Sequence, residues 1–123
     1  MVLVTDGKNL IRDAMAGTIA YYVNQAGLGT SSSSNPQEAD TGLNNNTNLG
    51  TPAATIKSVS NEKADKQVVY SYTLLSTEAA ANTFREFGLS ASGTAKLFNR
   101  QVFYDLYHGS TDEINITQAI SIK

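Results

Sequence analysis

The sequence predicts one mainly β domain: an antiparallel β-sandwich or small barrel, with a short N-terminal α-helix and a long Gly/Ser/Asn-rich loop. Three observations favour this fold. The 123 residues are enough for one ordinary domain and too few for a second full core. Charged residues make up only 16% of the chain, and 12 Ser, 13 Thr and 11 Asn take their place, which suits strands and turns better than long solvated helices. Several short runs also alternate apolar and polar residues.

The N-terminal segment predicts an amphipathic helix over residues 6–16. Its apolar residues recur at helical spacing: Leu10, Ile11, Ala14 and Met15. Thr5 or Asp6 offers a side-chain oxygen to cap the start of the helix, and Gly17 is a natural stop. The β-branched and aromatic run that follows, residues 18–23, predicts the first strand.

Residues 24–54 predict a long loop, because this stretch is rich in glycine, serine and asparagine. Loops of this length are uncommon inside a compact domain and usually have a function or are disordered. Its polar composition is interrupted by leucines at Leu28, Leu43 and Leu49. We therefore expect a neighbouring subunit to hold the loop, with these three leucines as inter-subunit contacts.

The remainder, residues 55–123, predicts the β-rich body of the domain. Strands are expected over residues 55–60, 67–77, 83–90, 95–107 (interrupted near Asp105) and the final segment. Turns are expected at residues 61–65, 91–94 and 108–111. The final segment alternates most regularly, with one apolar face made of Ile114, Ile116, Ile120 and Ile122. This pattern is typical of a half-buried antiparallel strand.

One charged residue in the predicted strands requires a partner. Glu86 lies between the aromatic residues Phe84 and Phe87, at the expected edge of the core. A carboxylate in such a place is usually paired, and Arg100 on the adjacent predicted strand is the natural partner. We expect a structural ion pair that fixes the sheet, in preference to a catalytic carboxylate.

Composition excludes several classes of function. A net charge of −2 argues against broad electrostatic binding to nucleic acid or acidic membranes. The absence of cysteine excludes disulfides, thiolate zinc sites, iron–sulfur clusters and cysteine nucleophiles. No apolar run approaches the ~20 residues of a membrane span, and the N-terminus lacks the basic region of a secretory signal. We expect a protein without membrane insertion, made and used without export.

No motif for catalysis or cofactor binding stands out. The Gly27–Thr30 segment lacks the Lys-Ser/Thr pair of a phosphate-binding loop. The single histidine, His108, has three neighbours of the residue types that complete a triad: Asp105, Ser110 and Asp112. Nothing near it indicates a strained nucleophile or an oxyanion hole, so a structural turn histidine is favoured. We therefore expect no enzyme activity, no cofactor and no metal site.

Several short motifs follow one another in a set order. The first half carries LVTDGKNLIRD (residues 3–13), GLGT (27–30) with a serine run, and DTGL (40–43). The second half carries FREFGL (84–89), then LFNR (97–100) and the alternating isoleucine strand. In order and spacing, the chain resembles small structural proteins of tailed viruses over nearly its whole length. It departs from their commoner pattern in its asparagine-rich insert and in lacking an arginine after DTGL.

This resemblance implies a non-enzymatic virion protein, made in the host cytoplasm, that works as a multimer in the tail, baseplate or tail-fibre region. Its partners would be copies of itself and other virion proteins. A capsid decoration or head-fibre protein is one alternative. Another is a module that binds host-surface glycan, because exposed tyrosines and Asn/Asp-rich loops suit sugar binding.

Overall fold

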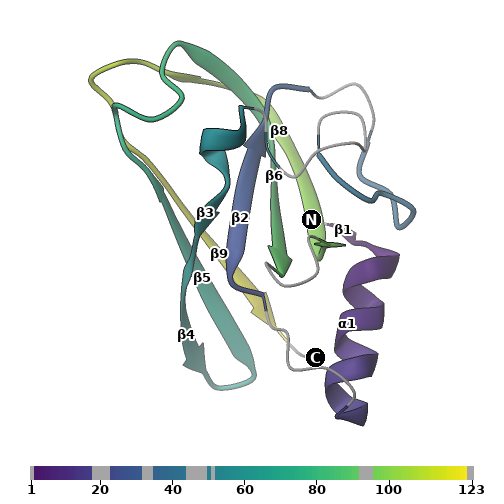
Figure 1. Cartoon of the computed structure of the whole chain (residues 1–123). Helices are drawn as coiled ribbons and strands as arrows, with labels where there is room; N and C mark the ends of the chain where they lie inside the picture. Colours follow the sequence, from purple (N-terminus) through teal and green to yellow (C-terminus); the bar gives the residue numbers. More distant parts are fainter. Residues whose placement is uncertain are drawn as a thin grey trace.

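Two antiparallel β-sheets face each other in the computed structural model, and one α-helix lies beside the larger sheet (Figure 1). The structure describes residues 2–17, 23–31, 35–43, 50, 52–91 and 96–121. The expected mainly β, sandwich-like fold with a short N-terminal helix is therefore confirmed. Within the described ranges the two sheets remain separate and do not close into a barrel.

The strands of the larger sheet are β1 (Val2–Leu3), β2 (Gln25–Gly29), β3 (Lys57–Ser58), β6 (Asn82–Ala91), β7 (Lys96–Leu97) and β8 (Asn99–His108). Those of the smaller sheet are β4 (Ser60–Ala64), β5 (Gln67–Leu74) and β9 (Ile114–Ser121). The larger sheet has the order β1-β8-β6-β2-β3, with β7 also paired to β6, and the smaller has the order β4-β5-β9. A single residue, Val59, separates β3 from β4, so the chain passes directly from one sheet to the other.

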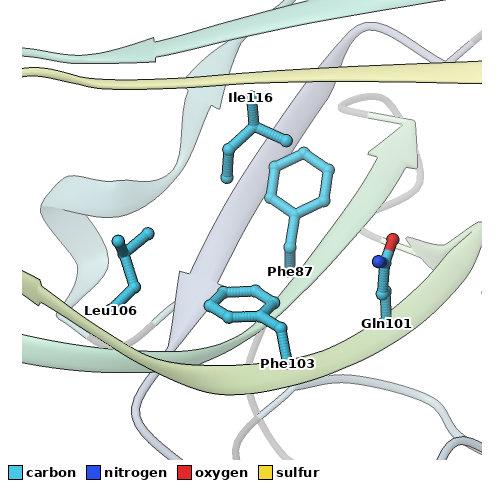
Figure 2. Close-up of a pocket in the computed structure, with 5 residues that line it drawn as sticks. All are labelled: Phe87, Gln101, Phe103, Leu106 and Ile116. Atoms are coloured by element: carbon cyan, nitrogen blue, oxygen red, sulfur yellow. The ribbon is translucent and has the colours of Figure 1, made fainter.

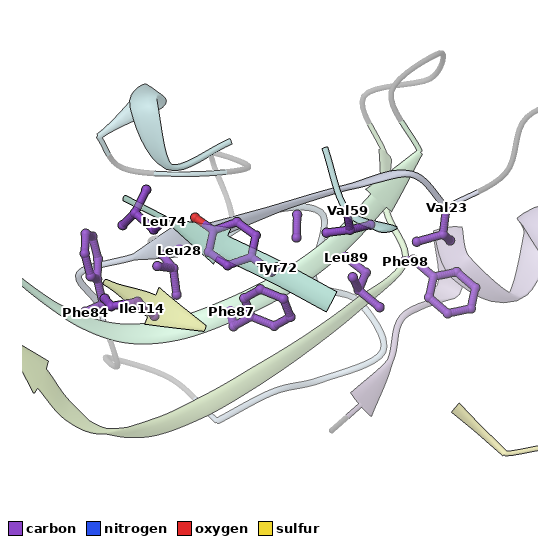
Figure 3. Close-up of a cluster of buried hydrophobic side chains, with 11 residues drawn as sticks. Val23, Leu28, Val59, Tyr72, Leu74, Phe84, Phe87, Leu89, Phe98 and Ile114 are labelled. Carbon is purple, nitrogen blue, oxygen red and sulfur yellow. The ribbon is translucent and has the colours of Figure 1, made fainter. Parts of the chain in front are cut away.

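The main core lies between the two sheets (Figure 3). Among the described residues its buried members are Val23, Ala26, Leu28, Val59, Tyr72, Leu74, Phe84, Phe87, Leu89, Phe98 and Ile114. The Tyr72 ring packs edge-on against Phe87, with ring centroids 5.4 Å apart. The Tyr72 hydroxyl donates a hydrogen bond of 2.6 Å to the Thr55 carbonyl. Burial, with a smaller contribution from the charge of Glu78, raises the pKa of Tyr72 and keeps this hydroxyl protonated as a donor.

Apolar alternation located the longer strands correctly. β5, β6, β8 and β9 overlap the ranges that the sequence predicts. On β9, Ile114, Ile116 and Ile120 alternate with exposed polar residues as expected, while Ile122 lies outside the described residues. The turn expected at residues 91–94 also lies largely outside them.

The expected interruption near Asp105 is an irregularity in strand pairing, and it does not break β8. Phe84 on β6 pairs with Leu106 on β8, whereas Glu86 pairs with Val102. Two steps along β6 therefore match four steps along β8, so β8 bulges around Asp105. Bulges of this kind bend a strand and redirect its side chains.

The prediction of one long loop over residues 24–54 is wrong at both of its ends. Its first residues form β2, which lies inside the larger sheet between β6 and β3. Its last residues begin the short 3₁₀ helix η1 (Ala53–Thr55). Glycine in β2 has a packing reason, because a Cβ on Gly29 would lie 2.3 Å from Glu86 Oε1. A glycine-rich stretch indicates a loop when only the sequence is considered. Here the glycine at position 29 leaves room for the side chain of Glu86.

The turn predicted at residues 61–65 is also wrong. Residues 60–64 form β4, and the turn to β5 falls at residues 65–66, where Lys66 adopts a φ of 61°. Every residue of β4 is exposed, because β4 is an edge strand of the smaller sheet. Charged and polar residues on an exposed edge strand look like a turn in the sequence, although they protect the edge from association.

The helix α1 (Thr5–Ala16) begins one residue earlier than expected and without the expected cap. Its N-cap residue is Val4, and no side chain caps it, so the expected capping by Thr5 or Asp6 is wrong. The Thr5 N–H instead donates 2.7 Å to the Glu38 carbonyl. Gly17 ends the helix as expected, with a φ of 71°. Of the strand predicted over residues 18–23, only Val23 is described, and it is not in a strand.

Replacing Gly29 by alanine should destabilise the protein by about 1–3 kcal/mol, because the new methyl group overlaps the buried Glu86 carboxylate. The matched control is Gly109→Ala, whose Cβ would lie 3.1 Å from the end of the Asp112 side chain and 3.6 Å from the Tyr107 ring. Urea unfolding midpoints measure both effects. A Gly29→Ala variant as stable as the parent would contradict this packing.

Candidate interaction surface

The ion pair predicted between Glu86 and Arg100 is present. Arg100 Nε donates to Glu86 Oε2 at 2.8 Å, and neither side chain is exposed to solvent. Strand pairing places the two residues on neighbouring strands, β6 and β8. Because side chains alternate across a sheet, Glu86 points away from the core that contains its neighbour Phe87. The pair therefore lies on the outer face of the larger sheet.

Asp40 is a second carboxylate bound to Arg100. Arg100 Nη1 donates to Asp40 Oδ2 at 3.1 Å, and the Asp40 side chain is only 4% exposed. The same carboxylate oxygen accepts a hydrogen bond of 2.9 Å from the Gln37 N–H. Asp40 therefore fastens the segment of residues 35–43 to the larger sheet. No pattern in the sequence indicates this contact, because Asp40 lies in a polar segment far along the chain from its partner.

The leucines expected to contact a neighbouring subunit are core residues of this chain. Leu28 is fully buried between the two sheets. Leu43 is fully buried on the outer face of the larger sheet, against Val4 and Leu97. This placement corrects the expectation for Leu28 and Leu43, because side chains enclosed by their own chain are not available to another subunit. Leu49 lies outside the described residues.

The described part of the expected loop is thus held by its own chain. Besides Asp40 and Leu43, Glu38 binds the start of α1 through its carbonyl and, through its carboxylate, forms an ion pair with Lys8. The expectation that a neighbouring subunit holds this segment is therefore unnecessary for residues 35–43. Because residues 35–43 are mostly polar, the sequence pattern does not reveal their two buried anchors, Asp40 and Leu43.

His108 has a structural position. It is fully buried, with Nδ1 3.3 Å from the Ala79 carbonyl oxygen and Nε2 2.9 Å from the Asp112 carbonyl oxygen. Its own carbonyl accepts a 2.8 Å hydrogen bond from the Ala81 N–H. His108 therefore joins the loop between β5 and β6 to the turn between β8 and β9. Its ring nitrogens both face main-chain carbonyls, not the hydroxyl or carboxylate that a catalytic triad requires.

The loop between β5 and β6 is held by Glu78. Its carboxylate accepts hydrogen bonds from the Lys57 ammonium group and, at 2.8 Å, from the Leu75 N–H. These two bonds, that of Lys57 first, hold the pKa of Glu78 below its ordinary value of 4.5. The ionised form of Glu78 is therefore the form that stabilises this loop.

An exposed apolar surface lies along β8. β1 pairs only with Asn99 and Arg100, so in the described part of the chain the outer backbone edge of Gln101–His108 has no partner strand. We call this stretch the β8 edge. Its large side chains are exposed: Tyr104 is 96% exposed, Tyr107 63% and Leu106 36%. An open strand edge with apolar side chains is a site of association.

A pocket opens beside the β8 edge, between the two sheets (Figure 2). It has a volume of about 190 Å³ and is lined by Phe87, Gln101, Phe103, Leu106 and Ile116. Figure 2 shows the four apolar side chains converging on one space, with the Gln101 amide at its side. An apolar cavity of ~150 Å³ is large enough to bind benzene, so this pocket suits one apolar side chain.

The surroundings of the pocket are acidic. From Gln101 to Ser121 the chain contains Asp105, Asp112 and Glu113 but neither lysine nor arginine. Arg85 on β6 reaches across to Asp105, with Nε 2.7 Å from Oδ1. The ion pair of Arg85 with Asp105 is partly exposed, so solvent weakens it and the two side chains can change partners.

In the described ranges, no helix is long and apolar enough to cross a membrane. No three acidic or histidine side chains of those residues gather in an arrangement that could hold a metal ion.

Comparison with protein-family models, curated proteins and solved structures finds no match for this chain.

Replacing Asp40 by asparagine should lower the free energy of unfolding by about 1.5–3 kcal/mol, the range for a hydrogen bond to a charged group. The matched control is Asp13→Asn, which weakens the more exposed pair with Arg12 and should change stability by less than ~1 kcal/mol. Chemical denaturation compares the two. Equal effects of the two substitutions would contradict the role given to Asp40.

Replacing Glu78 by glutamine should destabilise the protein at pH 7, and this effect should diminish as the pH falls below the ordinary pKa of 4.5. Because the folded state lowers the pKa of Glu78, its contribution is complete above the unfolded-state pKa and disappears as the pH falls through the folded-state pKa. Urea denaturation of parent and variant at several pH values measures the difference. A difference that persists unchanged at pH 3 would show that the charge of Glu78 is not its cause.

Proposed function

We propose that this protein is a non-enzymatic structural subunit that assembles into a multimer through the β8 edge. The observation that carries the proposal is the exposure of Tyr104, Leu106 and Tyr107 along an open strand edge. Tyrosine buries a large, rigid and amphipathic surface with little loss of conformational entropy, and it is enriched among the residues that dominate interfaces.

One edge of the smaller sheet supports this proposal by contrast. β4 is also an edge strand, but all its residues are exposed and it carries Glu62 and Lys63. Charged edge strands discourage association. The β8 edge has one carboxylate, Asp105, among the exposed side chains of Tyr104, Leu106 and Tyr107. β4 therefore suits solvent, whereas the β8 edge suits a partner.

The order of sequence motifs supports placing the multimer in the virion of a tailed virus. The proposed location is the tail, baseplate or tail-fibre region, among other virion proteins. The alternative location is the capsid, where the protein would be a decoration or head-fibre protein. Electron microscopy of particles with an antibody or tag on this subunit distinguishes the locations.

A second candidate function, binding of host-surface glycan, is favoured by one specific feature. Tyr104 and Asn35 line a shallow hollow on the surface, together with Val102 and Phe103. An exposed aromatic ring beside an amide suits a sugar, which stacks on the ring and hydrogen-bonds to the amide.

The double variant Tyr104→Ser, Tyr107→Ser should shift the protein from multimer to monomer in light scattering across a concentration series. Loss of two exposed side chains should leave the unfolding midpoint nearly unchanged. Lys63→Ser, on the β4 edge, is the control and should assemble like the parent.

A double variant that assembles like the parent would contradict the proposed role of the β8 edge. A parent that remains monomeric at every concentration would contradict self-assembly itself. Repeatable glycan binding that the single variant Tyr104→Ser removes would instead favour the adhesin.

A further inference from the structure

Building on the proposed function, we infer that the pocket beside the β8 edge receives the helix α1 of a second copy of this chain. The copies would then contact each other head to tail. Met15 of α1 is the inserted side chain, and its neighbour Ile11 packs against the rim of the pocket.

These two side chains form an exposed apolar pair. Ile11 is 42% exposed and Met15 is 85% exposed. They lie four residues apart, so they are neighbours on one face of the helix. Lys8 and Arg12 share this face, at the same helical spacing. The face therefore combines an apolar pair with two positive charges.

The pocket matches the apolar part of this face. Its volume of about 190 Å³ suits a single side chain, and its lining is formed mainly by Phe87, Phe103, Leu106 and Ile116. Methionine is unbranched and flexible, so it fills irregular gaps well, and its sulfur interacts favourably with aromatic rings. Met15 thus suits a pocket with two phenylalanine rings.

Charge supports the same pairing. The face of α1 contributes Lys8 and Arg12, whereas β8, β9 and the turn between them contribute Asp105, Asp112 and Glu113 without lysine or arginine beyond Arg100. Arg85 on the neighbouring β6 is paired with Asp105. Lys8 and Arg12 have partners within the chain, Glu38 and Asp13. These pairs are largely exposed, so their small contribution does not prevent re-pairing across an interface. Complementary charges would orient the helix as it approaches.

The two surfaces of one copy do not meet. Among the described residues, none that lines the pocket belongs to α1, and Ile11 and Met15 are exposed in the copy that carries them. Figure 1 shows α1 and the connection between β8 and β9 at opposite corners of the domain. Each copy therefore presents one helix and one pocket. Such a contact is heterologous, and it produces a closed ring or an open filament according to the rotation between copies.

Cysteine cross-linking tests this contact cleanly, because the natural chain contains no cysteine. Purified Met15→Cys and Leu106→Cys variants are mixed at a concentration where the parent is multimeric and then oxidised. We expect a disulfide-linked dimer containing one copy of each variant. The chain carrying both substitutions should form a ladder of longer products. Lys63→Cys mixed with Leu106→Cys is the control and should cross-link at least tenfold less.

A second, non-covalent test uses charge reversal. Arg12→Glu should weaken association several-fold, and mixing with Glu113→Lys should restore it. Both residues lie on exposed positions, so folding should be preserved. Restoration by the reversed partner is a result that a purely structural effect of either substitution would not give.

The outcomes separate this inference from the proposed function. Cross-linking of Met15→Cys copies mainly to each other would show that helix pairs with helix, which overturns the head-to-tail contact. A multimer in light scattering without the mixed cross-link would also overturn it, while self-assembly stands. A parent that is monomeric at every concentration would overturn both.

Discussion

Burial of the Arg100 guanidinium is the constraint on which the outer half of the molecule depends. A charge removed from water must be met by opposite charge inside the protein, or the fold loses several kcal/mol. Glu86 and Asp40 meet it from two directions, one from the neighbouring strand and one from the segment of residues 35–43. Gly29 has no side chain because Glu86 occupies that space. Four separate parts of the chain are therefore positioned by one cation.

This ionic cluster also explains how a rigid domain presents a free edge. Asn99 and Arg100 at the start of β8 pair with β1, and Arg100 is anchored in the cluster. Beyond them the same strand continues, through a bulge, with Tyr104 and Tyr107 exposed. Surfaces for binding are most precise when they lie on rigid elements whose positions are fixed by packing behind them.

Much of the fold could be predicted from local pattern, because pattern reflects the face that a strand buries. The alternating isoleucines located β9, and a lone carboxylate among aromatic residues led to the pair of Glu86 with Arg100. β2 could not be found this way, since its glycines have a tertiary reason. Asp40 and the open edge of β8 were missed because sequence spacing records neither distant partners nor which strand ends a sheet.

The pairing of β2 with β6 has a consequence for folding during synthesis. Gln25 pairs with Ser90 and Gly29 with Glu86, so β2 leaves the ribosome long before its partner exists. Pairings between distant segments form slowly, because closing a long loop has a high entropic cost. β4 and β5 are consecutive in the chain, so their hairpin can form as soon as both have been synthesised. The first third of the chain must therefore remain hydrated and unaggregated until β6 is complete, and its many hydroxyl and amide side chains suit that interval.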